Sequence, residues 1–123
     1  MIYLSPITDK NRIKALFESK NLEFGEFSGC VTASDRGEEL GFSLFDLTDE
    51  KITVHYIEPI TDISLADGIL RSTLHVAAER SIMKAFYSDT LPEDFLDKIG
   101  FIKEKAEKSL DIDKLFKSCC SCK

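Results

Sequence analysis

Residues 52–82, ITVHYIEPITDISLADGILRSTLHVAAERSI, hold the pattern that decides the fold. Ile52–Ile57 has the β-branched and aromatic composition of a strand, and Pro59 ends it because proline has no N–H for the sheet ladder. From Ala66 to about Arg80, small and apolar residues recur at the spacing of one buried helix face. The residues of this face are Ala66, Ile69, Leu70, Thr73, Leu74 and Ala77. The stretch therefore predicts a strand, a short polar connection and a helix.

The connection between this strand and this helix carries Thr61, Asp62 and Ser64, which are residue types that cap helices well. Free backbone N–H groups and the helix dipole converge at such a point, so it is a common place for an anion site. The alternative is an ordinary strand–loop–helix element of the core, and the local pattern leaves both open.

The flanking sequence extends this unit into a mixed sheet. Before it we expect a strand, a helix and a hairpin, and after it a strand, a short helix and another strand. In chain order these are Met1–Ser5, a helix from Thr8 or Asp9 to about Lys20, Cys30–Ser34 with Leu40–Phe45, Met83–Tyr87, Pro92–Ile99 and Phe101–Glu104. The predicted fold class is α+β.

Two motifs within this order carry a resemblance to a known family. Asp97-Lys98-Ile99-Gly100-Phe101 is similar to the closing motif of GNAT-type acyl-CoA N-acyltransferases, and Ile69-Leu70-Arg71 is similar to the start of their cofactor helix. The resemblance implies a mixed, mostly antiparallel sheet of six or seven strands flanked by helices. It also implies that Ile52–Ile57 and Met83–Tyr87 are neighbouring strands that diverge at a cofactor cleft.

The same resemblance implies acetyl-CoA as the cofactor, with its diphosphate at the loop before the helix. Anchored on the helix, the family's loop positions fall on Thr61, Ser64 and Ala66; anchored on Pro59, they fall on Asp62, Leu65 and Asp67. The first alignment keeps a small residue last and is preferred. The residues implied for cofactor binding are Tyr56, Ile57, Ile63, Ser64, Ala66 and Arg71.

This loop departs from the family pattern in two ways. Its first glycine is absent, although glycine there lets the backbone approach a phosphate closely. In addition, Glu58, Asp62 and Asp67 surround the helix start with carboxylates, which repel a diphosphate, while Arg71 is the nearby cation. We therefore expect a weakened cofactor site.

For catalysis, the resemblance implies a carboxylate base and a tyrosine acid. Glu58 is the expected base, with His55 as the other candidate, and Tyr87 is the expected acid because Leu96 stands at the family's tyrosine position. The implied reaction transfers an acetyl group to a small-molecule amine or a protein acceptor. Leu22–Gly29 either lines the acceptor groove or supplies two core phenylalanines.

The chain ends in a cysteine-rich segment. We expect one domain over residues 1–117 and a tail over residues 118–123, in which Cys119, Cys120 and Cys122 could share a soft metal ion such as Zn²⁺ or Cu⁺. The fourth ligand would come from Cys30, His55 or His75. A disulfide or unorganised thiols are the alternatives.

Composition bounds the remaining possibilities. The chain of 123 residues is 43% hydrophobic and 31% charged, with a formal net charge of −6, which disfavours nucleic acid and anionic membranes as partners. The N-terminus lacks the pattern of a signal peptide, so we expect a cytoplasmic protein. The oligomeric state stays open, a homodimer included. Two further functions remain alternatives to acetyl transfer: a non-catalytic GNAT-like binding module, and a metal- or redox-responsive protein that uses the tail.

Overall fold

The decisive stretch forms the centre of the molecule. The computed structural model describes residues 2–115, and within it β4 (Ile52–Glu58) leads through a short connection into α2 (Ile63–Ala78). The other elements are β1 (Ile2–Pro6), α1 (Lys10–Ser19), β2 (Ser28–Asp35), β3 (Glu38–Leu47), β5 (Ala85–Tyr87), α3 (Glu93–Ile99), β6 (Ile102–Glu104) and β7 (Ser109–Leu110).

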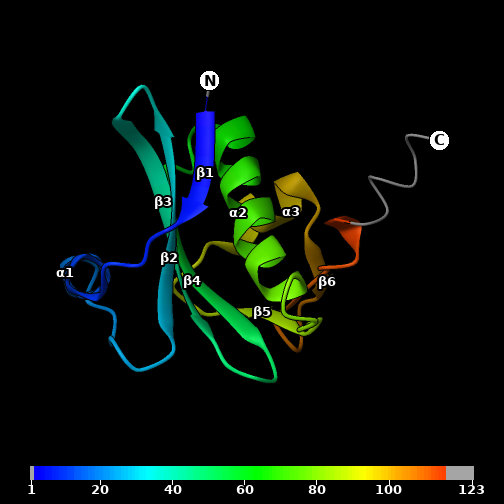
Figure 1. Cartoon of the computed structure of the whole chain (residues 1–123). Coiled ribbons are helices and arrows are strands. Elements are labelled where there is room, and N and C mark those ends of the chain that lie inside the picture. The colour runs from blue at the N-terminus through cyan, green and yellow to red at the C-terminus, as the bar shows by residue number, and fades with distance from the viewer. Residues whose placement is uncertain (1, 116–123) are drawn as a thin grey trace.

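The strands form one sheet in the order β1-β2-β3-β4-β5-β7-β6. Every neighbouring pair is antiparallel except β4 and β5, which are parallel and joined by the crossover helix α2. The sheet lies between α1 on one face and α2 with α3 on the other (Figure 1). The predicted α+β class and the neighbouring strands joined by the long helix are confirmed, and of the six or seven strands expected the sheet has seven.

The main core lies between the sheet and α2. All six residues of the predicted helix face are buried: Ala66, Ile69, Leu70, Thr73, Leu74 and Ala77. The hydroxyls of Thr73 on α2 and Ser43 on β3 are hydrogen-bonded at 2.5 Å inside this core, and both residues are fully buried. Thr73 also donates to the carbonyl of Ile69, so each hydroxyl in the apolar interior has a partner.

A smaller core lies on the opposite face of the sheet, under α1. Of the two starting residues that the sequence left open, Thr8 and Asp9, it is Asp9 that caps this helix, by accepting from the N–H groups of Asn11 and Arg12. Ile13 and Phe17 turn inward against the sheet residues Cys30, Phe42 and Leu44. Of the two phenylalanines in the connection that follows α1, Phe24 packs edge-on against Phe17, whereas Phe27 is 51% exposed.

At Gly41, β3 lies close against the end of β4 and Pro59. A Cβ atom there would lie against the carbonyl oxygen of Glu58 and 2.8 Å from Cδ of Pro59. Further along the same strand pair the register shifts, so that Phe45 faces Val54 while Leu44 faces Tyr56, leaving His55 as an extra residue in β4. This bulge places His55 and Tyr56 next to each other on the α1 face.

Several boundaries differ from the predicted ones. Helix α2 begins at Ile63 rather than Ala66 because Asp62, not Ser64, is its N-cap and accepts from the N–H of Leu65 at 3.1 Å. Strand β5 begins only at Ala85, because the chain first leaves α2 through Ser81, which has a positive φ. No helix within residues 2–115 is long and apolar enough to cross a membrane.

Candidate functional site

The parallel strands β4 and β5 separate halfway along β4. Their pairing covers Ile52–Val54 and Ala85–Tyr87, but β4 continues for four more residues to Glu58. Beyond the last pair, the N–H of Ser88 still bonds to the carbonyl of Val54, and the Thr90 hydroxyl bonds to the carbonyl of His55 at 2.6 Å. The two strand ends are therefore held apart by the segment that follows β5.

This separation opens a hollow of about 240 Å³ at the end of β4. Its walls are the β4 end, the connection to α2 and the segment before α3, with lining residues Tyr56, Ile57, Glu58, Pro59, Ile60, Thr61, Thr90 and Pro92. A small hollow beside the unpaired end of β4 suits a ligand whose amides bond to strand backbone.

The N-terminus of α2 begins next to this hollow. Of its first N–H groups, that of Leu65 bonds to the Asp62 carboxylate and that of Ala66 to the Asp62 carbonyl. Within residues 2–115, the N–H groups of Ile63 and Ser64 have no such partner. Two donors thus remain for an anion, but the charge of Asp62 lies at the same helix end.

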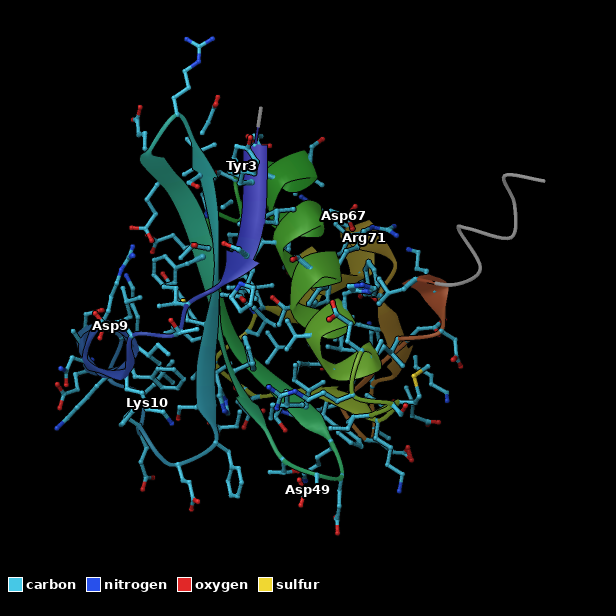
Figure 2. All side chains as sticks on the ribbon, in the orientation of Figure 1. Tyr3, Asp9, Lys10, Asp49, Asp67 and Arg71 are labelled. Atoms are coloured by element: carbon cyan, nitrogen blue, oxygen red, sulfur yellow. The ribbon has the colours of Figure 1, made fainter. Side chains whose placement is uncertain are left out.

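A second hollow, of about 210 Å³, lies between the first turns of α2 and the end of α3. Figure 2 shows Asp67 and Arg71 side by side on α2, where Arg71 Nε donates to Asp67 Oδ2 at 3.0 Å. The Arg71 guanidinium also lies over the ring of Phe101, and Lys98 lines the same hollow. The other carboxylate oxygen of Asp67 is buried without a hydrogen bond within the described chain.

Glu58, the predicted base, is already engaged on the α1 face of the sheet. Its Oε1 accepts from the Tyr56 hydroxyl at 2.6 Å and from Lys20 Nζ at 3.0 Å. These two donors, that of Tyr56 first, hold the pKa of the Glu58 carboxyl below its ordinary value. The hydrogen bond to Glu58 and that to Tyr56 raise the pKa of Lys20. The Glu58 carboxylate is thus held ionised in an ion pair with Lys20, and it is not poised to take up a proton.

Tyr87, the predicted acid, faces the other side of the sheet. It is 2% exposed within the main core, and its hydroxyl donates to Glu93 Oε2 at 2.7 Å. Burial, followed by the Glu93 carboxylate, raises the pKa of Tyr87 to about 12. Tyr56 packs with the α1-side core, so Glu58, two residues further along the strand, lies on that face as well. The structure therefore does not bring the two predicted catalytic residues together.

A hydrogen-bonded chain that the sequence did not reveal lies on the α1 face of the sheet, across β2, β3 and β4. Asp46 accepts from Ser28 at 2.9 Å and pairs with His55 Nε2 at 3.0 Å. The His55 bond, with a smaller contribution from Ser28, lowers the pKa of Asp46. Serine bonds to the carboxylate and not to histidine, so this is not a nucleophilic triad. Only the strand register, which aligns β2, β3 and the β4 bulge, could have revealed it.

Comparison with known proteins was made by sequence and by structure. No protein-family model and no curated protein matches the chain significantly. Solved structures do match: an aminoglycoside acetyltransferase from an uncultured soil metagenomic sample in complex with sisomicin has a TM-score of 0.61 at 12% identity, covering 85% of this chain and 90% of that one. A ribosomal-protein-alanine N-acetyltransferase from Brucella melitensis biovar Abortus 2308 has a TM-score of 0.58 at 17% identity, covering 80% and 90%.

A third match names the family in its description. A putative acetyltransferase of the GNAT family from Desulfovibrio desulfuricans has a TM-score of 0.57 at 14% identity, covering 85% of this chain and 87% of that one. The fold is that of the GNAT proteins. At these identities the likeness extends to the fold alone.

The GNAT-like closing motif has a clear structural basis. Helix α3 ends at Ile99, Gly100 takes a left-handed φ of 72°, and Phe101 is fully buried. Lys114 donates to the carbonyls of Ile99 and Gly100 and so caps the same helix end. Leu96, at the position of the family's tyrosine, is fully buried and offers no proton.

The cofactor residues implied by the GNAT resemblance divide into two groups. Tyr56 lines the hollow from the α1 face, while Ile57 points into the main core and borders the hollow as well. Ile63, Ser64 and Arg71 border the second hollow, but Ala66 is fully buried against the sheet. Ala66 could therefore act only through its backbone, and its N–H is already bonded within the helix.

The predicted metal ligands Cys119, Cys120 and Cys122 lie outside the described residues. Within residues 2–115 no group of three or more potential metal ligands occurs. Of the suggested fourth ligands, Cys30 is buried, and burial raises its pKa to about 12, which disfavours the thiolate that a metal needs. His55 is paired with Asp46, and His75 lies near Glu79 on the exposed side of α2.

Proposed function

We propose that this protein is an N-acetyltransferase that uses acetyl-CoA and an amine acceptor. The observation that carries the proposal is the separation of β4 from β5. It opens a hollow at the end of β4 whose lining extends to Thr61, just before α2, and within the described chain the N–H groups of Ile63 and Ser64 at the start of that helix have no partner. When bound, acetyl-CoA supplies an acetyl group activated as a thioester.

The residues present fit one part of this cofactor better than the other. The hollow along Tyr56–Thr61 fits a pantetheine arm, because it is small, has no cation among its described lining residues and borders the unpaired end of β4. The diphosphate would meet the two free N–H groups, Arg71 and Lys98, but also the carboxylates of Asp62 and Asp67.

The opposing charges set the expected affinity. A carboxylate about 6 Å from a unit negative charge costs roughly 0.7 kcal/mol at a dielectric near 80. Two carboxylates against the two charges of a diphosphate thus cost on the order of 3 kcal/mol, or about a hundredfold in affinity. We expect acetyl-CoA to bind in the high-micromolar range or more weakly.

On the acceptor side, Glu58 is the group that we propose receives the amine. Its carboxylate stays ionised, because its pKa is lowered by Tyr56 and Lys20, so it binds and orients an ammonium. The ammonium must lose one proton before its nitrogen can attack the thioester. That proton passes to water, so acetyl transfer is favoured at higher pH. Tyr87 is bonded to Glu93, so proton delivery to the leaving thiolate falls to solvent, with Tyr87 a poor donor.

The experiment is a calorimetric titration with acetyl-CoA, followed by mass spectrometry of amine acceptors incubated with acetyl-CoA and protein. High-micromolar binding together with acceptor masses raised by one acetyl group would support the proposal. Submicromolar binding would contradict the electrostatic argument, and no binding at millimolar acetyl-CoA would overturn the proposal itself.

A non-catalytic GNAT-like binding module is the second candidate. It is favoured by the fact that the site's groups are satisfied internally: Asp62 caps α2, Tyr87 bonds to Glu93, and Lys20 pairs with Glu58. Binding of acetyl-CoA without transfer to any amine offered would favour this candidate.

A further inference from the structure

The side chain of Lys20 lies against the sheet, where its ammonium group contacts a carboxylate and two aromatic rings. Lys20 follows the last residue of α1 and reaches across to the end of β4, where its Nζ is 3.0 Å from Glu58 Oε1. The same Nζ lies 5.0 Å from the ring centre of Tyr56 and 6.0 Å from that of Phe42. A carboxylate and two aromatic faces thus surround one ammonium group.

The surrounding groups do not depend on Lys20 for their arrangement. Phe42 and Tyr56 lie on neighbouring strands with ring centres 5.8 Å apart, and the Tyr56 hydroxyl orients Glu58 by a separate 2.6 Å hydrogen bond. Phe42, Tyr56 and Glu58 all belong to the sheet, whereas Lys20 comes from the end of a different element. The ammonium site would therefore remain if the lysine side chain moved away.

The contact is also weak enough to be exchanged. The side chain of Lys20 is 30% exposed and that of Glu58 42%, and ion pairs at such exposure contribute little to stability. An added ammonium ion would find the same carboxylate and the same rings, so it would compete directly with Lys20.

The position of this site gives it a role. Tyr56 and Glu58 also line the hollow between the separated strands, so an ammonium held between them lies at the rim of that hollow. We infer that Phe42, Tyr56 and Glu58 form a binding site for a primary alkylammonium group, which Lys20 fills in the ligand-free protein. Its use as the acceptor subsite rests on the proposed function; the binding itself does not.

The Lys20 side chain, which fills the site in the ligand-free protein, indicates which class of ligand the site accepts. A lysine side chain presents an unbranched alkyl stem that ends in a primary ammonium, so the site accepts that shape between its two rings. Two sources share this chemistry: the lysine side chain of a peptide, and a free aliphatic amine. The blocked amino acid Nα-acetyl-lysine-methylamide and 1,4-diaminobutane represent them.

The test is amine binding to Lys20→Ala, followed through the ring NMR signals of Tyr56. The simplest probe is n-butylamine at neutral pH, where it is fully protonated. We expect it to bind the variant about tenfold more tightly than the wild type, because the internal competitor is gone. Lys14→Ala, on the exposed side of the same helix, is the matched control and should bind like the wild type.

A second substitution tests whether the named groups form the site. Adding Glu58→Gln to Lys20→Ala should weaken n-butylamine binding by about tenfold or more, since the amide keeps the shape but not the charge. Should Lys20→Ala fail to fold, Lys20→Ser offers the same opening. Equal affinity of the wild type and the lysine variant, or of the single and double variants, would overturn the inference.

The same protein samples distinguish the two amine sources and test the proposed function independently of the ammonium site. Tighter binding of the blocked lysine indicates a peptide acceptor, tighter binding of 1,4-diaminobutane indicates a free amine, and either supports the site. Acetyl-CoA is then titrated into the Lys20→Ala protein. Amine binding without acetyl-CoA binding would leave the ammonium site in place and overturn acetyl transfer alone.

Discussion

At the scale of single residues, the hydroxyl of Tyr87 gives the clearest pH signature. Burial, followed by the hydrogen bond to Glu93, raises its pKa to about 12 from an ordinary value of 10.0. The folded state therefore holds the hydroxyl proton more strongly than the unfolded state. Burial of the neutral hydroxyl, together with its bond to Glu93, stabilises the fold fully below about pH 10, and this stabilisation is lost as the pH rises towards 12.

Tyr87→Phe tests this signature. The variant should be about 1–2 kcal/mol less stable than the wild type at pH 7, because one buried hydrogen bond to a carboxylate is lost. The difference should narrow steadily above pH 10. Urea unfolding at pH 7, 10 and 11 measures it, and a difference that stays constant with pH would show that the hydroxyl is not protected in the fold.

At this scale, the sequence singled out candidate residues but did not predict what they contact. Glu58 could be singled out because it ends a strand before a proline. Its partner Lys20 lies at the end of another helix, far earlier in the chain, and no local pattern relates the two. The same holds for Asp46 and His55, whose pairing depends on a one-residue bulge. Side-chain partners of this kind follow from register, which short-range sequence patterns do not specify.

At the scale of elements, the N-terminus of α2 combines a stabilising cap with an electrostatic obstacle. Asp62→Asn should keep the cap, since asparagine also accepts from the N–H of Leu65, while removing the charge that opposes a diphosphate. We expect up to about tenfold tighter acetyl-CoA binding and little change in stability. Asp62→Ala should gain affinity as well but cost about 1 kcal/mol of stability.

Calorimetry and urea unfolding measure these two effects separately. The matched control is Asp49→Asn, because Asp49 lies at the tip of the β3–β4 hairpin, before β4 begins, whereas α2 starts after β4 ends (Figure 2). Unchanged acetyl-CoA affinity in both Asp62 variants would show that the α2 terminus does not meet the diphosphate.

The close approach of β3 to the end of β4 gives a second prediction at this scale. Gly41→Ala would press its Cβ against Glu58 and Pro59, so the strands must shift, and we expect a loss of about 1–3 kcal/mol. A Cβ at Gly25 meets no atom within 4 Å, so Gly25→Ala should lie within about 0.5 kcal/mol of the wild type. Comparable urea midpoints for the two variants would contradict this packing.

The elements themselves were largely predictable. The buried face of α2 was predicted correctly at all six positions, because small and apolar residues at helical spacing are typical of a helix that packs one face on a core. The boundaries of α2 were harder to predict, because Thr61, Asp62 and Ser64 are all good caps and the sequence does not rank them. The structure selects Asp62, which lengthens α2 by one turn towards the hollow.

At the scale of the whole molecule, the cysteine-rich end should be separable from the fold. Replacing Cys119, Cys120 and Cys122 together by serine should change the melting temperature by no more than about 3 °C, because residues 2–115 by themselves already form two apolar cores and the seven-stranded sheet. If the cluster has a function, the same variant should lose a bound metal or a defined disulfide. Metal analysis and mass mapping of gently purified, untagged protein check this. A large fall in melting temperature would mean that the tail contributes to the fold.

The hydrogen bond between Ser43 and Thr73 has a consequence for how this molecule can respond to a ligand. If α2 slid or turned relative to β3, the Ser43 hydroxyl would lose its partner in an apolar interior, at a cost of about 1–3 kcal/mol, while Thr73 would keep its bond to Ile69 within the helix. The hydrogen bond thus favours one position of α2 against the sheet. We therefore expect the protein to adjust to a ligand through partly exposed side chains such as Lys20, while α2 and the sheet keep their relative position.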